Sequence, residues 1–180
     1  MNDVTVENVV TSTSAGAELD LDALNNDLPQ SEYNREQFPG LIYRSQDPKA
    51  TTLIFRSGKI VCTGAKSLKD AKKALNQLFN QFDSLGLEYD EPEITVQNIV
   101  SSADLDKRLN LNAIAIGLGL ESVEYEPEQF PGLVYRLDEP DVVTLLFGSG
   151  KLVITGASSR SEAKTALDEL RTHLDEYGLV

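Results

Sequence analysis

Apolar and polar residues along this chain follow two kinds of pattern, and each kind occurs twice. Short segments in which apolar and polar residues alternate predict β-strands, whereas apolar residues at every third or fourth position predict amphipathic helices. The expected strands span residues 4–13, 41–44, 51–55 and 59–63 in the first copy, and 94–102, 133–136, 143–147 and 151–155 in the second. Each copy also predicts a short helical stretch after its first strand and a long helix at its end.

The expected helices begin at residues suited to capping. Asp20 and Asn110 precede the short stretches, where Leu19, Leu21 and Leu24 correspond to Leu109, Leu111 and Ile114. The long helices begin at Ser67-x-x-Asp70 and Ser159-x-x-Glu162, which fit a capping box when Asp is accepted in place of Glu. Their apolar stripes are Ala71, Leu75, Leu78 and Phe82 in the first copy, and Ala163, Leu167, Leu170 and Leu174 in the second.

Whole motifs are repeated as well as patterns. Gln37-Phe-Pro-Gly-Leu-Ile-Tyr-Arg44 returns as Gln129-Phe-Pro-Gly-Leu-Val-Tyr-Arg136, at an offset of 92 residues. Ser57-Gly-Lys and Ser149-Gly-Lys have the same offset and predict tight hairpin turns. A period of this length exceeds the roughly 20 to 50 residues of solenoid repeats. We therefore expect two half-repeats, residues 1–90 and 91–180, fused into one domain.

Both faces of the expected sheet are apolar. Residues alternate between faces along a strand, so Ile54, Ile60 and Cys62 should point one way and Leu53, Phe55, Val61 and Thr63 the other. The few helices can cover only one face, which leaves a broad apolar surface open for binding. The alternative is that a second sheet packs on this face in a sandwich.

Composition limits the class of protein. The 180 residues are 41% hydrophobic, carry a net charge of -13 and contain no apolar run long enough to span a membrane. Met-Asn-Asp at the start lacks the pattern of a secretory signal, so we expect a soluble cytoplasmic protein. The lone Cys62 suits a buried apolar position. Acidic residues spread along the whole chain are typical of proteins from salt-loving organisms.

The apolar face carries few polar groups, and these are repeated. Asn8 and Asn98 can donate hydrogen bonds to the row of acceptors in the DNA minor groove, where only guanine adds a donor. Close-packed Val and Leu side chains would clash with that guanine amine, which favours A·T pairs. Exposed phenylalanines would act as wedges between base steps. Arginine and lysine residues at the sheet margins would meet phosphates.

The repeated motifs Asn-Ile/Val-Val, Phe-Pro-Gly-Leu-Ile/Val-Tyr-Arg, Ser-Gly-Lys and Val-x-Thr-Gly-Ala resemble the core of the TATA-box-binding protein family. The resemblance covers essentially the whole chain and is closest to archaeal, salt-adapted members. It implies an α+β fold: a saddle-shaped ten-stranded antiparallel sheet with helices on the convex face. It also implies a general transcription initiation factor that binds and bends the A·T-rich TATA box in double-stranded DNA, and recruits transcription factor B and RNA polymerase.

Candidate functional residues follow from the apolar face and from the resemblance. The DNA-binding candidates are Asn8, Val10, Phe38, Arg44, Leu53, Phe55, Lys59, Val61, Thr63, Asn98, Val100, Phe130, Arg136, Leu145, Phe147, Lys151, Val153 and Thr155. By the resemblance, Glu126 and Glu128 contact transcription factor B; the alternative is that they are solvated loop acids. The protein is expected to bind DNA as a monomer, and a dimer in the absence of DNA stays open.

Other chemistry finds little support in the sequence. Gly117-x-Gly119 lacks the third glycine of a dinucleotide fingerprint, and the only histidine, His173, has no Cys or Asp at ligand spacing. We therefore expect no enzyme activity, no cofactor, no metal site and no membrane partner. The rival function is a non-catalytic module that binds a protein or a lipid-like ligand on the apolar sheet.

Overall fold

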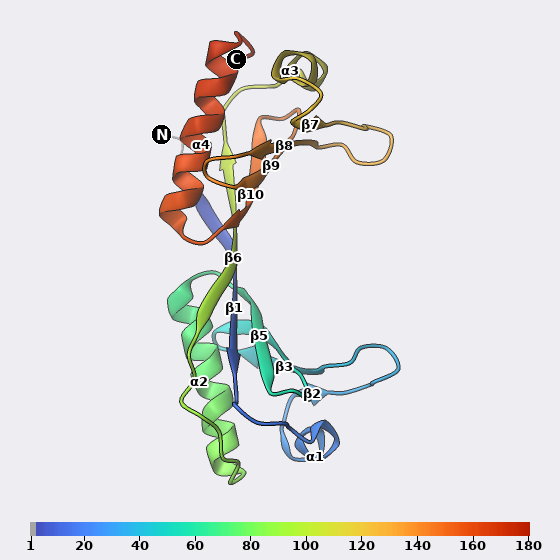
Figure 1. Cartoon of the computed structure of the whole chain (residues 1–180), viewed down its shortest axis with the longest axis vertical. Helices are drawn as coiled ribbons and strands as arrows, with labels where there is room; N and C mark the ends of the chain where they lie inside the picture. The colour runs from blue at the N-terminus through green and yellow to red at the C-terminus, as the bar shows by residue number, and fades with distance from the viewer. Residues whose placement is uncertain (1–2) are drawn as a thin grey trace. The chain divides into compact units, whose positions relative to one another are not determined.

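Ten strands and four helices make up the described part of the chain (Figure 1). The computed structural model describes residues 3–180; Met1 and Asn2, which belong to the segment interpreted as lacking a secretory signal, lie outside it. The elements of the first copy are β1 (Thr5–Ser14), α1 (Leu21–Asp27), β2 (Ser31–Glu32), β3 (Leu41–Gln46), β4 (Lys49–Ile54), β5 (Lys59–Ala65) and α2 (Leu68–Ser84). Those of the second are β6 (Thr95–Asp104), α3 (Leu111–Leu118), β7 (Val123–Glu124), β8 (Leu133–Leu137), β9 (Val142–Leu146), β10 (Lys151–Ala157) and α4 (Arg160–Glu176).

The strands are ordered β2-β3-β4-β5-β1-β6-β10-β9-β8-β7 in one antiparallel sheet, which confirms the expected sheet and strand number. The two-residue strands β2 and β7 are too short to be recognised from periodicity; they form by pairing with β3 and β8. The sandwich alternative is wrong for the described residues, because their strands all belong to this one sheet.

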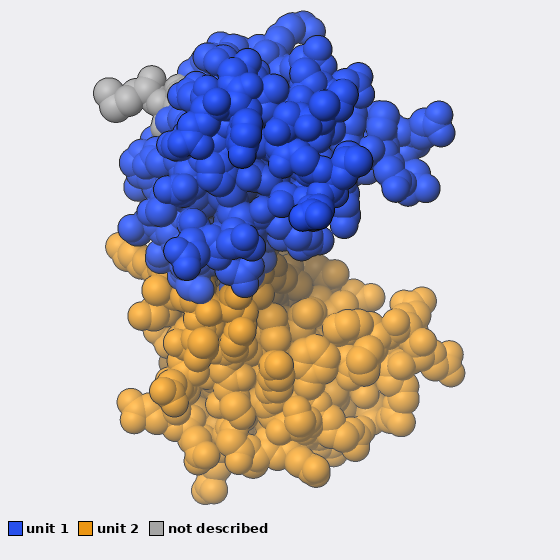
Figure 2. Space-filling view, turned by 45° about the horizontal axis from the view of Figure 1, so that its top comes forward, with its two compact units in different colours: residues 1–7, 98–180 blue, residues 8–97 orange. Residues whose placement is uncertain are grey.

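The chain divides into two compact units (Figure 2). Unit 2 consists of residues 8–97 and holds most of the first copy, whereas unit 1 consists of residues 1–7 and 98–180. Strands β1 and β6 therefore each contribute residues to both units. Each unit has its own cluster of buried apolar side chains.

Within each unit, one face of the sheet is covered by the long helix. Ile54, Ile60 and Cys62 are fully buried against α2, whose own buried residues include the expected stripe. The alternate residues Leu53 and Val61 are only half-buried, so the assignment of the two faces from the sequence is confirmed. Unit 1 repeats this arrangement with α4, whose buried residues also include the expected stripe.

The predicted helix caps are present. The side chains of Asp20 and Asn110 accept hydrogen bonds from backbone N–H groups in the first turns of α1 and α3. Ser67 and Ser159 do the same for α2 and α4. Such caps satisfy N–H groups that have no partner within the helix.

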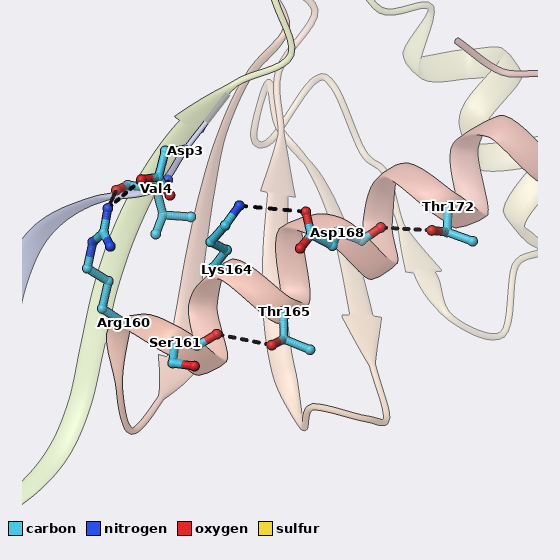
Figure 3. A network of polar contacts seen from close by, with 8 residues as sticks. All are labelled: Asp3, Val4, Arg160, Ser161, Lys164, Thr165, Asp168 and Thr172. Atoms are coloured by element: carbon cyan, nitrogen blue, oxygen red, sulfur yellow. Dashed lines mark hydrogen bonds and ion pairs between the residues drawn. The ribbon is translucent and has the colours of Figure 1, made fainter. Parts of the chain in front are cut away.

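The start of the described chain is fastened to α4 in unit 1 (Figure 3). Arg160 Nη2 lies 2.6 Å from Asp3 Oδ2 and donates to the carbonyl oxygen of Val4 at 3.2 Å, while Val4 is buried in the core of the unit. These bonds hold the Asp3 carboxylate in its ionised form. The hydrogen bond from the Val4 backbone N–H and then the bond from Arg160 lower the pKa of Asp3 below its ordinary value of 3.8.

Candidate nucleic-acid interface

Each unit leaves one face of its sheet open, and the predicted apolar residues lie on it. In unit 2, Leu53 lies opposite Val61 across β4 and β5, and in unit 1 Leu145 lies opposite Val153 across β9 and β10. All four side chains are half-buried, as are the predicted contact residues Val10 and Val100. In each unit, the open face of the sheet therefore presents large aliphatic side chains in register on neighbouring strands.

The asparagine of each copy is held in a fixed orientation at this face. Asn8 Oδ1 accepts a hydrogen bond from the Gly64 backbone N–H at 2.7 Å, and Asn8 Nδ2 donates to Thr63 Oγ1 at 3.1 Å. Because a backbone N–H can only donate, the amide oxygen must face Gly64. The amide nitrogen retains a second N–H that has no acceptor among the described residues.

Unit 1 reproduces this constellation closely. Asn98 Oδ1 accepts from the Gly156 N–H at 2.6 Å, and Asn98 Nδ2 donates to Thr155 Oγ1 at 3.0 Å. Each glycine has a left-handed backbone, with φ of +93° at Gly64 and +100° at Gly156, and each lies beside an irregularity in strand register. The register irregularity and the left-handed glycine accompany the N–H that orients the amide.

Four phenylalanines form two edge-to-face pairs. The ring centroids of Phe38 and Phe55 are 5.9 Å apart, and those of Phe130 and Phe147 are also 5.9 Å apart. None of the four rings is buried, and 42% of Phe130 is exposed. The rings are therefore available for contact with a ligand, and no second layer of backbone covers them in the described residues.

The glycine of each Phe-Pro-Gly motif has a role that the sequence did not reveal. The sequence pattern favours Pro-Gly simply as a break in regular structure, but Gly40 and Gly132 do not have left-handed backbones. A Cβ at Gly132 would lie 2.6 Å from Phe130 Cε2 and 3.0 Å from Phe147 Cε1, and Gly40 is similarly close to its two rings. The absence of a side chain lets both rings pack over the backbone.

The four predicted phosphate-binding side chains are exposed. Arg44 pairs with Thr51, which pairs with Thr63, so these residues share the open face. Arg136 has the equivalent place in unit 1, and Lys59 and Lys151 lie on the same face by strand alternation. Arg44 already has an acidic partner within the protein: its Nη1 lies 3.2 Å from Glu32 Oε2 in an exposed ion pair.

Acidic residues line the same hollow as Lys151. A hollow of about 550 Å³ in unit 1 is lined by Lys151 and Phe147 and by the acidic residues Asp3, Asp104 and Asp106. Asp104 is directly opposite Lys151 in the strand pairing, whereas Ser14 is opposite Lys59 in unit 2. The strand position opposite the margin lysine is therefore acidic in unit 1 and neutral in unit 2.

Several residues of the open face were not recognised from the sequence. Ile42 and Val134 extend the rows that contain Leu53 and Leu145, because their strands pair in register. Ser12 and Ser102 extend the same rows on β1 and β6, opposite Val61 and Val153. Alternation along the expected strands 41–44 and 133–136 was a signal that could have identified Ile42 and Val134, whereas identifying the serines required the strand register at β1 and β6.

The loops between β2 and β3 and between β7 and β8 differ in chemistry. Glu126 and Glu128 are exposed on the second loop, where the first has Asn34 and Glu36. The first loop is joined to α1 by an ion pair 3.0 Å long between Arg35 and Asp22, and the second has Pro127 in place of that arginine.

The remaining reactive groups have structural roles. Burial raises the pKa of the Cys62 thiol, which keeps it protonated and unreactive. His173 lies at the edge of the core, where Nδ1 is 2.8 Å from the Tyr135 hydroxyl. No group of three His, Cys, Asp or Glu residues in the described chain is arranged to hold a metal ion. A search of the same residues finds no helix with the length and apolarity to cross a membrane.

Comparison with known proteins agrees with this arrangement. The model of the family described as "Transcription factor TFIID (or TATA-binding protein, TBP)" matches residues 3–85 and 93–177. The chain belongs to this family. Among TATA-binding relatives, "TATA-box-binding protein 2" of Haloferax volcanii is 63% identical over 178 residues, covering 98% of this chain and 96% of the relative. The "TATA-box-binding protein" of Archaeoglobus fulgidus is 54% identical over 178 residues, covering 98% and 97%.

A solved structure of the TATA-binding family has the same fold. "Methanococcus jannaschii TBP" superimposes with a TM-score of 0.87 and 48% sequence identity, and the match covers 97% of this chain and 99% of that one. The resemblance inferred from the repeated motifs is therefore confirmed. So is the archaeal and salt-adapted character of the relatives, most of which come from haloarchaea.

Proposed function

We propose that this chain is a general transcription initiation factor that binds the TATA box in the minor groove of double-stranded DNA. The observation that carries the proposal is the constellation repeated in both units: an open apolar face with one oriented asparagine amide and one pair of phenylalanine rings that are not buried. An apolar surface with so few polar groups suits a ligand that presents hydrogen-bond acceptors and few hydrogen-bond donors.

Selection for A·T pairs follows from the chemistry of this face. The minor groove presents adenine N3 and thymine O2 as acceptors, and Asn8 and Asn98 each have a second amide N–H, besides the one bonded to threonine, that can donate to them. The hydroxyl groups of Thr63 and Thr155 lie beside those amides. Val10 and Val100 would meet the exocyclic amine of guanine, which has no acceptor for its N–H groups on an aliphatic surface.

The phenylalanine pairs would bend the duplex. Inserting an apolar ring into a base step costs a few kcal/mol, and the bent duplex regains this energy through additional surface contact; TATA-binding proteins are themselves the standard example. In each pair one ring lies just after a strand of the sheet and the other on the Phe-Pro-Gly turn. Gly40 and Gly132 allow the two rings to approach and act as one wedge.

Phosphate contacts would contribute less than in most DNA-binding proteins. Arg44, Arg136, Lys59 and Lys151 are the candidates; Glu32 already pairs with Arg44, and Lys151 lines a hollow together with three aspartates. Proteins that depend on many phosphate contacts lose affinity steeply as salt rises. An apolar wedge does not depend on counterion release, so this face suits a cytoplasm with a high salt concentration.

Glu126 and Glu128 would contact transcription factor B, which in turn recruits RNA polymerase. The support is the difference between the two loops, since only the second presents two exposed glutamates without a neighbouring arginine. Such a difference can fix the direction of assembly on DNA when the two halves of the DNA-binding face are nearly equivalent. We expect a monomer on DNA.

The test is fluorescence anisotropy with an A·T-rich and a G·C-rich duplex in molar KCl, combined with energy transfer between dyes at the duplex ends. The wild-type chain should prefer the A·T-rich duplex and shorten the distance between its ends. Phe55→Ala with Phe147→Ala should abolish bending without loss of the helical circular-dichroism signal. Leu85→Gln, which removes an exposed leucine outside the face, serves as the control. Equal affinity for both duplexes would instead favour a module that binds a protein or a lipid-like ligand.

A further inference from the structure

Helix α3 exposes large aliphatic side chains that its counterpart α1 lacks. Ile116 is 80% exposed and Leu120, just beyond the helix, is 82% exposed, which makes them the most exposed large apolar residues among those described. The equivalent of Ile116 in the first copy is Asn26. Leu120 belongs to a two-residue insertion, since the first copy has only Pro29 between Leu28 and Gln30. Isolated exposed apolar residues are common, but a pair at one helix end in only one of two related units points to a specific contact.

The position of α3 is fixed by packing. Leu111, Ile114 and Ala115 are buried in the core of unit 1. Gly117 lies against Leu179 at the end of the chain, where an added Cβ would come within 2.9 Å of Leu179 Cδ1. The exposed pair is therefore presented on a firmly seated helix, so a partner would meet it already formed.

The surroundings of this pair are acidic. Residues 109–135 contain no lysine or arginine, and their four charged residues are Glu121, Glu124, Glu126 and Glu128, all exposed. In unit 2 the corresponding loop carries Arg35, which is paired with Asp22 on α1. A partner for the α3 region should therefore have an apolar patch bordered by basic side chains.

The aliphatic pair lies at the end of a helix that contacts the strand leading into the loop that we assign to transcription factor B. Helix α3 contacts β7, and the loop with Glu126 and Glu128 begins directly after β7 (Figure 1). We name the surface formed by Ile116, Leu120 and Glu121 the α3 surface. We propose that the α3 surface is an apolar docking site for transcription factor B, covered by a patch of that protein with basic residues at its border. The proposal rests on the proposed function, because it extends the partner contact assigned to the same end of unit 1.

The test uses the full chain with Ile116→Asn and Leu120→Gln together; the first change introduces the residue of the first copy, and the second makes the insertion polar. Binding of transcription factor B is measured in molar KCl both without DNA, by titration calorimetry, and on an A·T-rich duplex, by anisotropy. We expect factor B to bind roughly ten- to a hundred-fold more weakly in both assays, because two large aliphatic side chains are no longer buried. Affinity for the duplex alone should not change. Leu68→Gln, a change at an exposed leucine in unit 2, should bind factor B like the wild type.

The outcomes separate this proposal from the function on which it rests. Wild-type binding of factor B by the double variant would overturn the α3 surface while leaving TATA binding intact. Failure of the wild-type chain to prefer A·T-rich DNA would overturn the proposed function. Titration calorimetry without DNA would still show whether the double variant binds factor B more weakly than the wild type does. Sedimentation that shows a wild-type dimer and a monomeric double variant, with unchanged factor B binding, would assign the surface to self-association instead. Leu120→Lys provides a second variant on the exposed insertion, and it too should weaken factor B binding.

Discussion

Replacing Gly132 with alanine should separate DNA bending from folding. The added Cβ would lie 2.6 Å from Phe130 Cε2 and 3.0 Å from Phe147 Cε1, distances that ordinary side chains do not tolerate. One ring must move, and Phe130 is the one with freedom to do so, because 42% of it is exposed. Overpacking of this kind costs about 1–3 kcal/mol, and movement of an exposed ring keeps the cost near the lower end.

The expected result is a folded protein with a damaged wedge. The helical circular-dichroism signal should be retained, and the melting temperature should fall by only a few degrees. Energy transfer between dyes at the ends of an A·T-rich duplex should report markedly less bending than with the wild type. Affinity should fall as well, because a straighter duplex touches less of the protein surface.

Gly148 offers a matched control in the same unit. An added Cβ there would have its nearest neighbour at 3.9 Å, and its backbone is not left-handed, so Gly148→Ala should bend DNA normally. Gly150→Ala should instead reduce stability, because its φ is +95° and a Cβ would lie against the backbone carbonyl oxygen of Lys107. Normal bending by Gly132→Ala, or an equal defect in Gly148→Ala, would refute the role given to the motif glycine.

Three further predictions follow from the interface and the start of the chain. DNA affinity should change little, or rise, as KCl increases from about 0.5 to 2 M, and a steep fall in anisotropy titrations would show that phosphate contacts dominate after all. Asn98→Ala should lower affinity for an A·T-rich duplex by roughly three- to ten-fold, because it removes a donor and also leaves the Gly156 N–H without its acceptor; unchanged affinity would exclude the amide from binding. The lowered pKa of Asp3 means that its bonds to Val4 and Arg160 stabilise the fold above the ordinary pKa of 3.8 and cease to do so as pH falls through the lower, folded-state value. Thermal melts should therefore show that Asp3→Asn is less stable than the wild type at neutral pH and that the difference narrows below about pH 3.8, whereas a constant difference would contradict this assignment.

Alternation along the strands was sufficient to predict the two faces of the sheet. Ile54 and Leu53 are neighbours in the sequence with opposite environments, and no knowledge of the fold was needed to separate them. Capping was equally local, because Asp20 and Ser67 bond to N–H groups three residues away. The repeated motifs then identified the family.

Other features depend on contacts that sequence patterns do not encode. The orientation of the Asn8 amide depends on a hydrogen bond from the Gly64 N–H, which is 56 residues away in the sequence. Gly64 lies beside an irregularity in the register of β1 and β5. The role of Gly132 depends on two rings that approach from different segments. The exposure of Ile116 was also hidden, since an apolar residue in a short apolar helix suggests burial. The roles of the DNA-binding residues, of Glu126 and of Glu128 stay predictions.

The boundaries of the two units do not coincide with the boundary between the two sequence copies, which affects whether one copy could fold alone. Residues 1–7 belong with residues 98–180, while residues 91–97 belong with the first copy. A break between the copies would therefore give two polypeptides that each lack a strand end and carry the one needed by the other. A single-copy ancestor would have faced the same shortage, and exchange of leading strands between two identical chains would have met it. Joining two such copies in one polypeptide would make that exchange permanent.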